Sequence, residues 1–108
     1  MSDATTDAFQ SKIDALRRRF GERLQDNVRE LATLIADFSV DGNHDESREK
    51  IRRLSHSLAG VAGTIGFYEI SDAGADLENA ILDHAPDDRI CALAQSTIET
   101  INGQITPA

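Results

Sequence analysis

The strongest constraint on the fold is a row of apolar residues that recur every three or four positions through the first third of the chain. The row comprises Phe9, Ile13, Leu16, Phe20, Leu24, Val28, Leu31, Leu34, Ile35 and Phe38. This spacing, with one-residue slips, predicts a helix with one buried stripe. Asp7 with Gln10 three residues later predicts a capping box at its start. Gly21 marks either a kink or a break into a short helix followed by a long one.

A loop and a second helix are expected next. The run 41–43, Asp-Gly-Asn, has the composition of a turn. Asn43 with Glu46 three residues later predicts the cap of a helix over about 44–64. Gly66 is expected to close that helix, because glycine is the usual residue just past a helix end.

Two further amphipathic helices complete the pattern. One is expected over about 67–83, and Pro86 is expected in the first turn of the last, with Asp87 and Asp88 facing the positive end of its dipole. Their stripes are Phe67, Ile70, Ala73, Leu77, Ala80 and Ile81, and then Ile90, Leu93, Thr97, Ile101 and Ile105. The sequence therefore predicts an all-α, antiparallel up-down four-helix bundle, with a short extra N-terminal helix if the chain breaks at Gly21.

Composition and charge narrow the class of protein. A length of 108 residues predicts one domain over 1–108. The formal charge of −8 argues against nucleic-acid binding, which needs a clustered basic surface. Cys91 is the single cysteine, and we find neither a signal peptide nor a long apolar run, since the first seven residues are polar and acidic. We therefore expect a cytoplasmic monomer with no membrane contact.

The second helix places one histidine on its exposed face. On a helical wheel at about 100° per residue, one stripe contains Ile51, Leu54, Leu58, Val61 and Ile65. His56 lies about 170° from the centre of that stripe, which predicts an imidazole facing water.

Small residues share that face. Gly60 and Gly63 follow His56 at i+4 and i+7, with Ala59 beside them, and Arg52 and Arg53 lie one turn before. Taken singly, a surface histidine is usually only a polar residue, and internal glycines can serve helix packing. Together on one face they favour a surface that a partner must approach closely, because each helical glycine costs about 0.8–1 kcal/mol relative to alanine.

These residues resemble the histidine-containing phosphotransfer (HPt) domain family. The resemblance rests on the run His56-Ser57-Leu58-Ala59-Gly60, then Gly66, Ile70 and Leu77-Glu78, and it covers about 51–81. It implies a four-helix bundle whose histidine, here His56, exchanges a phosphoryl group with receiver-domain aspartates of response regulators or hybrid histidine kinases. It also implies a carrier with no kinase activity and no cofactor of its own, the partner receiver supplying Mg²⁺.

One position departs from the family pattern. Ala59 stands where the family often has Lys or Arg, a side chain thought to hold the phosphoryl group. We hypothesise that Arg52 or Arg53 substitutes for it. Both belong to a basic cluster with Arg48 and Lys50 that could equally be a solvated face balancing nearby carboxylates.

Three other functions compete with phosphotransfer. A hydrolase built on Ser55 or Ser57 fails, because side chains adjacent on a helix diverge by about 100° and do not reach His56. The three histidines lack metal-ligand spacing, so no metal site is expected. A pure adaptor that docks on receivers without exchanging phosphate is the serious competitor, and it would not need His56.

Overall fold

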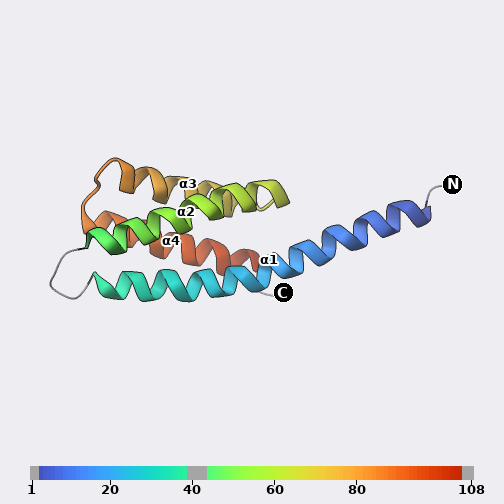
Figure 1. Ribbon diagram of the computed structural model, residues 1–108, viewed down its shortest axis with the longest axis horizontal. Helices are drawn as coiled ribbons and strands as arrows, with labels where there is room; N and C mark the ends of the chain where they lie inside the picture. Colours follow the sequence, from blue (N-terminus) through green and yellow to red (C-terminus); the bar gives the residue numbers. More distant parts are fainter. Residues whose placement is uncertain (1–2, 39–43, 106–108) are drawn as a thin grey trace.

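The computed structural model describes residues 3–38 and 44–105, and within them the chain forms four α-helices and no strand (Figure 1). The helices are α1 (Asp3–Asp37), α2 (Asp45–Ile65), α3 (Tyr68–Leu82) and α4 (Asp87–Ile105). α1 and α3 each contact both α2 and α4, as in an up-down four-helix bundle, which confirms the predicted fold class. α1 continues without a break through Gly21, so there is no separate N-terminal helix.

An aliphatic core joins the inner stripes of the four helices. Its largest fully buried apolar side chains are Leu24, Leu31, Ile51, Leu58, Ile70, Leu77, Ile90 and Ile101. Two polar side chains are also buried, and each bonds within its own helix. Ser55 Oγ donates to the Ile51 carbonyl at 2.6 Å, and Thr97 Oγ1 donates to the Leu93 carbonyl at 2.8 Å. Buried hydroxyls therefore keep their hydrogen bonds, as a stable core requires.

The ends of the helices match some of the predicted caps. Gly66 ends α2 in the left-handed conformation, with φ 95°, and its N–H donates to the Ala62 carbonyl at 3.1 Å, which confirms the predicted end. His44 precedes α2 without a side-chain cap. The predicted loop at 41–43 and the capping role of Asn43 lie outside the described residues.

Two predicted starts require correction. The capping box at Asp7 is wrong because α1 begins at Asp3, and the Gln10 side chain instead donates to Asp14 at 3.0 Å. Pro86 was expected inside the first turn of the last helix, but α4 begins at Asp87. The Pro86 carbonyl accepts the backbone N–H of Ile90 at 3.1 Å, so the proline lies just before the helix.

The N-terminal part of α1 projects beyond the other three helices, and the molecule is 63 Å long as a result (Figure 1). Phe9 is 66% exposed and Leu16 is 49% exposed, whereas Phe20 is buried. The predicted buried stripe is therefore wrong before Phe20. Periodicity correctly identified the helical face, but no other helix of the bundle reaches that far to cover it.

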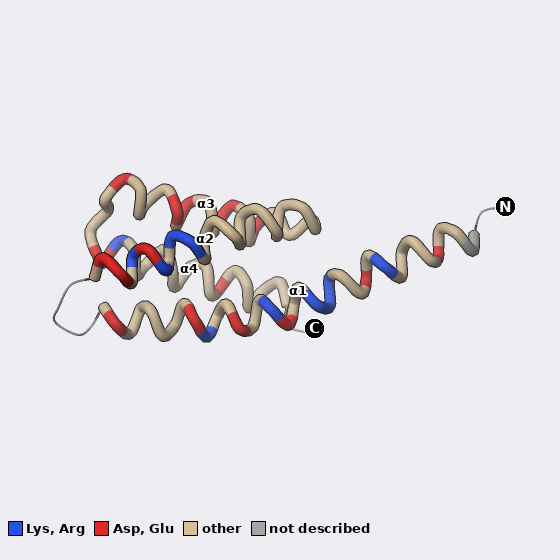
Figure 2. The backbone as a smooth tube through the Cα atoms, in the orientation of Figure 1, with Lys and Arg blue, Asp and Glu red and all other residues tan. Residues whose placement is uncertain are grey.

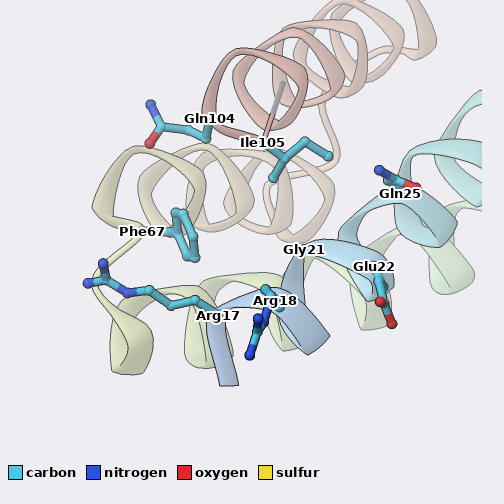
Figure 3. Close-up of a pocket in the computed structure, with 8 residues that line it drawn as sticks. All are labelled: Arg17, Arg18, Gly21, Glu22, Gln25, Phe67, Gln104 and Ile105. Atoms are coloured by element: carbon cyan, nitrogen blue, oxygen red, sulfur yellow. The ribbon is translucent and has the colours of Figure 1, made fainter. Parts of the chain in front are cut away.

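α1 leaves the bundle at a hollow lined by α1, α4 and the segment between α2 and α3. Figure 3 shows Arg17, Phe67 and Gln104 around this hollow. The Arg17 guanidinium donates to the Ile65 carbonyl at 3.4 Å and lies 6.0 Å from the centre of the Phe67 ring. The Phe67 ring also packs on Phe20, with centroids 5.7 Å apart. These contacts fix the direction in which α1 departs.

An ionic cluster ties the start of α2 to the start of α4. Asp87 contacts Arg48 Nη2 at 2.5 Å and His44 Nδ1 at 2.8 Å, and Arg48 also donates to the Ala85 carbonyl at 2.8 Å. The hydrogen bond from Arg48, and then that from His44, hold the pKa of Asp87 below its usual value.

This cluster predicts a specific loss of stability in acid. Because the pKa of Asp87 is lowered in the fold, its contribution is present above the unfolded pKa of about 3.9 and is lost as pH falls through the lower folded value. Urea unfolding of wild type and Asp87→Asn should differ most near neutrality and converge as the pH falls through the lowered pKa of Asp87 in the fold. The effect should be modest, since the Asp87 side chain is 46% exposed. A gap that stays constant with pH would contradict the assignment.

Candidate functional site

His56 lies in the middle of α2 with its side chain 73% exposed. Its neighbours Ser55 and Leu58 are buried and fix the rotation of the helix about its own axis. The imidazole therefore points away from the core, as the helical wheel predicts.

Glu78 on α3 holds one side of that imidazole. Its carboxylate oxygens lie 2.9 Å and 3.2 Å from His56 Nδ1. An ionised carboxylate has no proton to donate, so Nδ1 carries the hydrogen and donates it. The Nε2 atom of a neutral ring is then the unprotonated nitrogen. Because the Glu78 side chain is only 16% exposed, the carboxylate is held by the bundle while the ring it orients remains in solvent.

Arg52 lies near the contact between His56 and Glu78. It makes two hydrogen bonds to Glu49, at 2.9 Å and 2.6 Å, and its Nη1 lies 3.7 Å from the nearer Glu78 oxygen. The hydrogen bond from Arg52 lowers the pKa of Glu49. Arg53 is more exposed, at 65%, and its nearest carboxylate contact is Glu49 at 3.7 Å. Arg52 therefore contacts the carboxylate that orients His56, and Arg53 points more freely into solvent.

The small residues near His56 divide into two groups. A Cβ added at Gly60 would meet no atom within 4 Å, so this position is open. A Cβ at Gly63 would lie 3.1 Å from Ser71 Oγ on α3. Ser71 also donates to the Ala59 carbonyl at 2.7 Å. Helix packing therefore explains the space at Gly63, and the sequence-based argument that both glycines clear one exposed patch holds structurally for Gly60 alone.

This division predicts opposite responses to the same substitution. Gly60→Ala should raise the free energy of unfolding by about 0.5–1 kcal/mol, because alanine is the better helix former and meets nothing there. Gly63→Ala should gain less or lose stability, because Ser71 must move. Urea unfolding of both variants measures the difference. A loss of stability in Gly60→Ala would show that the site is more crowded than described.

A cavity of about 460 Å³ opens beside His56, between α1 and α2. Its lining residues are Leu16, His56, Ser57, Gly60, Val61, Thr64 and Ile65. Gly60 lines it from α2, and Leu16 lines it from α1. An apolar hollow beside an exposed imidazole offers a docking surface for a folded partner.

The charges of the chain are distributed unevenly among the four helices (Figure 2). Of the 11 Lys and Arg residues, six lie in α1, four in α2 and one, Arg89, in α4. α3 carries four carboxylates and no cation. The two helices that line the cavity carry ten Lys and Arg residues and also ten Asp and Glu residues, so their charges balance, whereas α3 is purely acidic.

Gly74, which sequence reasoning did not single out, lets α3 lie against α2. A Cβ there would lie 2.9 Å from the Ser55 carbonyl oxygen and 3.1 Å from the Ala59 nitrogen. Glu78 follows one turn later on the same helix, so the close approach at Gly74 brings its carboxylate to His56. The glycine in a predicted helix was the available signal, but its role depends on the packing partner.

Metal-binding clusters and membrane-spanning helices are both absent from the described residues, 3–38 and 44–105. Across residues 3–38 and 44–105, no group of three or more His, Cys, Asp or Glu residues could hold a metal ion. In the same part of the chain, no helix is long and apolar enough to cross a membrane.

Comparison with known proteins decides the family. The model of the Hpt domain matches residues 15–104, which include most of α1 and nearly all of the other three helices. The chain belongs to the Hpt domain family. No match was found among curated proteins or among solved structures. Hpt membership indicates histidine phosphotransfer in two-component signalling, a phosphocarrier role rather than that of a kinase.

The Hpt match also separates α1 into two parts. It begins at residue 15, near the point where α1 leaves the bundle, so the projecting residues before it lie outside the matched region. The exposed Phe9 belongs to this outer part, whereas Leu16 falls inside the match and lines the cavity beside His56.

Proposed function

We propose that His56 is the phosphoryl acceptor and donor of this Hpt domain, and that it shuttles the group between aspartates of receiver domains in response regulators or hybrid histidine kinases. The observation that carries the proposal is an exposed imidazole whose Nδ1 is held by Glu78 at 2.9 Å. Such a ring presents Nε2 to solvent in a fixed orientation, ready for attack on a partner's phosphoryl group.

The chemistry requires one bond exchange. The Nε2 lone pair attacks the phosphorus of the receiver's aspartyl phosphate, the new N–P bond forms, and the O–P bond breaks to release the aspartate carboxylate. The Nδ1 proton stays in place, and Glu78 balances the positive charge that develops on the ring. No base is needed at Nε2, because that nitrogen carries no proton. The receiver supplies Mg²⁺, which screens the phosphoryl charge.

The surroundings of His56 suit a receiver domain as partner. Gly60 leaves room for loops to approach, and the apolar cavity beside it offers contact area. Receiver active sites are rich in aspartate, so such a partner should approach from the side of α1 and α2, whose charges balance, rather than from the side of α3, which carries four carboxylates and no cation. We propose that Gly60 lies at the centre of the surface that contacts the receiver. Ala59 and Gly63 lie at the edge of that surface, on the side of α3.

We propose different roles for Arg52 and Arg53. The contacts of Arg52 favour a positioning role, in which it restrains Glu78. Arg53 is the more available to reach a phosphoryl group, since it is 65% exposed. Arg53→Ala should then slow transfer without changing the tautomer of His56. Arg52→Ala should change the tautomer populations, read by ¹⁵N NMR of the ring.

Phosphoryl transfer to the full chain tests the proposal. The protein is incubated with a phosphorylated receiver domain and, separately, with phosphoramidate, a small donor that needs no docking surface. Intact-mass analysis should show one added phosphoryl group, labile in acid and stable in base. Binding to receivers without any such addition would overturn the proposal and favour an adaptor.

Loss of the Glu78 charge should impair this transfer. Glu78→Gln keeps the shape of the side chain but removes the charge that favours a protonated Nδ1. Charge-assisted hydrogen bonds contribute about 1.5–3 kcal/mol, so the rate should fall by about tenfold or more. Single-turnover transfer from a phosphorylated receiver measures the rate, and Glu69→Gln on the same helix is the control. An unchanged rate in Glu78→Gln would remove Glu78 from the mechanism.

A further inference from the structure

Arg52 lies between two carboxylates but is hydrogen-bonded to only one of them. Its Nε and Nη2 atoms donate to Glu49 at 2.9 Å and 2.6 Å, one to each carboxylate oxygen. Its Nη1 atom lies 3.7 Å from Glu78 Oε2, which is beyond hydrogen-bond distance. The guanidinium therefore pairs with its neighbour on α2 and attracts the carboxylate on α3 only across a gap.

The oxygen of Glu78 that Arg52 approaches is also the oxygen nearest to His56. Oε2 lies 2.9 Å from His56 Nδ1, and Oε1 lies 3.2 Å from it. An arginine binds a carboxylate most strongly when it donates to both oxygens at once. Bound to Glu78 in that way, Arg52 would turn the carboxylate toward itself and neutralise the charge that keeps the hydrogen on Nδ1. Arg52 and His56 therefore compete for one carboxylate.

The pair of Arg52 with Glu49 has the geometry that keeps an exposed ion pair together. Most surface ion pairs contribute little, because two long side chains lose freedom when they form. The exceptions are two-point contacts between arginine and a carboxylate, and networks of several charges, and this pair meets both conditions. The hydrogen bond to Glu49 raises the pKa of Arg52 most, and the attraction of Glu78 raises it least. Glu49 therefore has the stronger hold on the cation.

We infer that Glu49 is a positioning residue for the imidazole of His56. By binding Arg52, it keeps that cation from Glu78 and leaves the Glu78 carboxylate to hold the hydrogen on Nδ1. Without Glu49, Arg52 can turn toward Glu78, the hold on Nδ1 weakens, and more of the rings carry their hydrogen on Nε2. This effect on the tautomer is independent of the proposed function. Its effect on phosphoryl transfer rests on that function, because only an Nε2 without hydrogen can attack.

The ¹⁵N chemical shifts of the His56 ring test the inference on the unphosphorylated full chain. They are measured at about pH 8.5, well above the ordinary imidazole pKa of about 6.5, where the ring is neutral. Glu49→Gln removes the charge and one of the two acceptor oxygens, so Arg52 loses its two-point contact. The ratio of rings with hydrogen on Nε2 to rings with hydrogen on Nδ1 should rise about two- to fivefold, the range that an exposed ion pair supports.

Two further variants separate this route from a general effect of charge. Glu46→Gln removes the same charge one turn earlier on α2, where Glu46 contacts Lys50 at 3.2 Å, and should leave the ratio unchanged. Glu49→Gln added to Arg52→Ala should give the same ratio as Arg52→Ala alone, because the competing cation is gone. An unchanged ratio in Glu49→Gln, an equal rise in Glu46→Gln, or a rise that persists without Arg52 would overturn the inference.

Phosphoryl loading then tests the consequence for the reaction. Phosphoramidate should load Glu49→Gln more slowly than wild type, in proportion to the fraction of rings that keep hydrogen on Nδ1, and should load Glu46→Gln at the wild-type rate. A wild type that accepts no phosphoryl group would refute the proposed function, while the tautomer ratio would still decide the role of Glu49. A shifted ratio with an unchanged loading rate would overturn the link between Glu49 and transfer.

Discussion

Replacing His56 by glutamine is expected to abolish phosphoryl acceptance and leave the fold intact. The His56 side chain is 73% exposed and contributes no core packing, so the free energy of unfolding should change by no more than about 0.5 kcal/mol. Glutamine has no nitrogen lone pair of comparable nucleophilicity, so neither a phosphorylated receiver nor phosphoramidate can form the N–P bond. Intact-mass analysis after incubation with each donor measures the loss.

A second exposed histidine provides the matched control. His84 lies just past the end of α3, far along the chain from the proposed site. His84→Gln makes the same chemical change and should accept the phosphoryl group at the wild-type rate. Acid-labile phosphate on His56→Gln, or its loss from His84→Gln, would place the acceptor at another residue.

Replacing Gly74 by valine should give the largest loss of stability. A Cβ at this position would lie 2.9 Å from a backbone oxygen of α2, an atom that cannot rotate away as a side chain can. α2 and α3 must therefore separate locally, and we expect a loss of about 3 kcal/mol, the upper part of the usual range for overpacking. Urea unfolding followed by circular dichroism measures it.

Gly103 offers the control for this substitution. It also lies inside a helix, but a Cβ there would meet nothing within 4 Å. Gly103→Val should change stability by no more than about 0.5 kcal/mol, as at other exposed positions. Equal effects at the two glycines would mean that helix propensity, rather than the contact between α2 and α3, determines the cost.

The local features of this chain were predictable because they depend on near neighbours in the sequence. Gly66 ends α2 as expected, since a left-handed residue at a helix end favours glycine. α2 and α3 begin and end within one residue of the expected bounds. The exposure of His56 follows from one apolar stripe and 3.6 residues per turn. Each of these inferences needs no knowledge of how the helices pack together.

Features that depend on packing between helices were missed or misjudged. The stripe at Phe9 and Leu16 has the period of a buried face, but period alone does not show whether another helix reaches that face. The contact of His56 with Glu78 spans 22 residues and depends on how α3 is shifted along α2. Gly63 shares the helical face of His56 on a wheel, yet the neighbouring α3 accounts for its missing side chain.

The position of His56 within a regular helix has a consequence for the rate of exchange with partners. α2 is continuous from Asp45 to Ile65, and buried side chains on both sides of His56 anchor it to the core. The helix that carries His56 is therefore already formed before a partner docks, so its ordering adds little conformational-entropy penalty to association. Near-rigid partners that bind without rearrangement can associate and separate quickly. A carrier that must release one partner before meeting the next benefits from that short residence time.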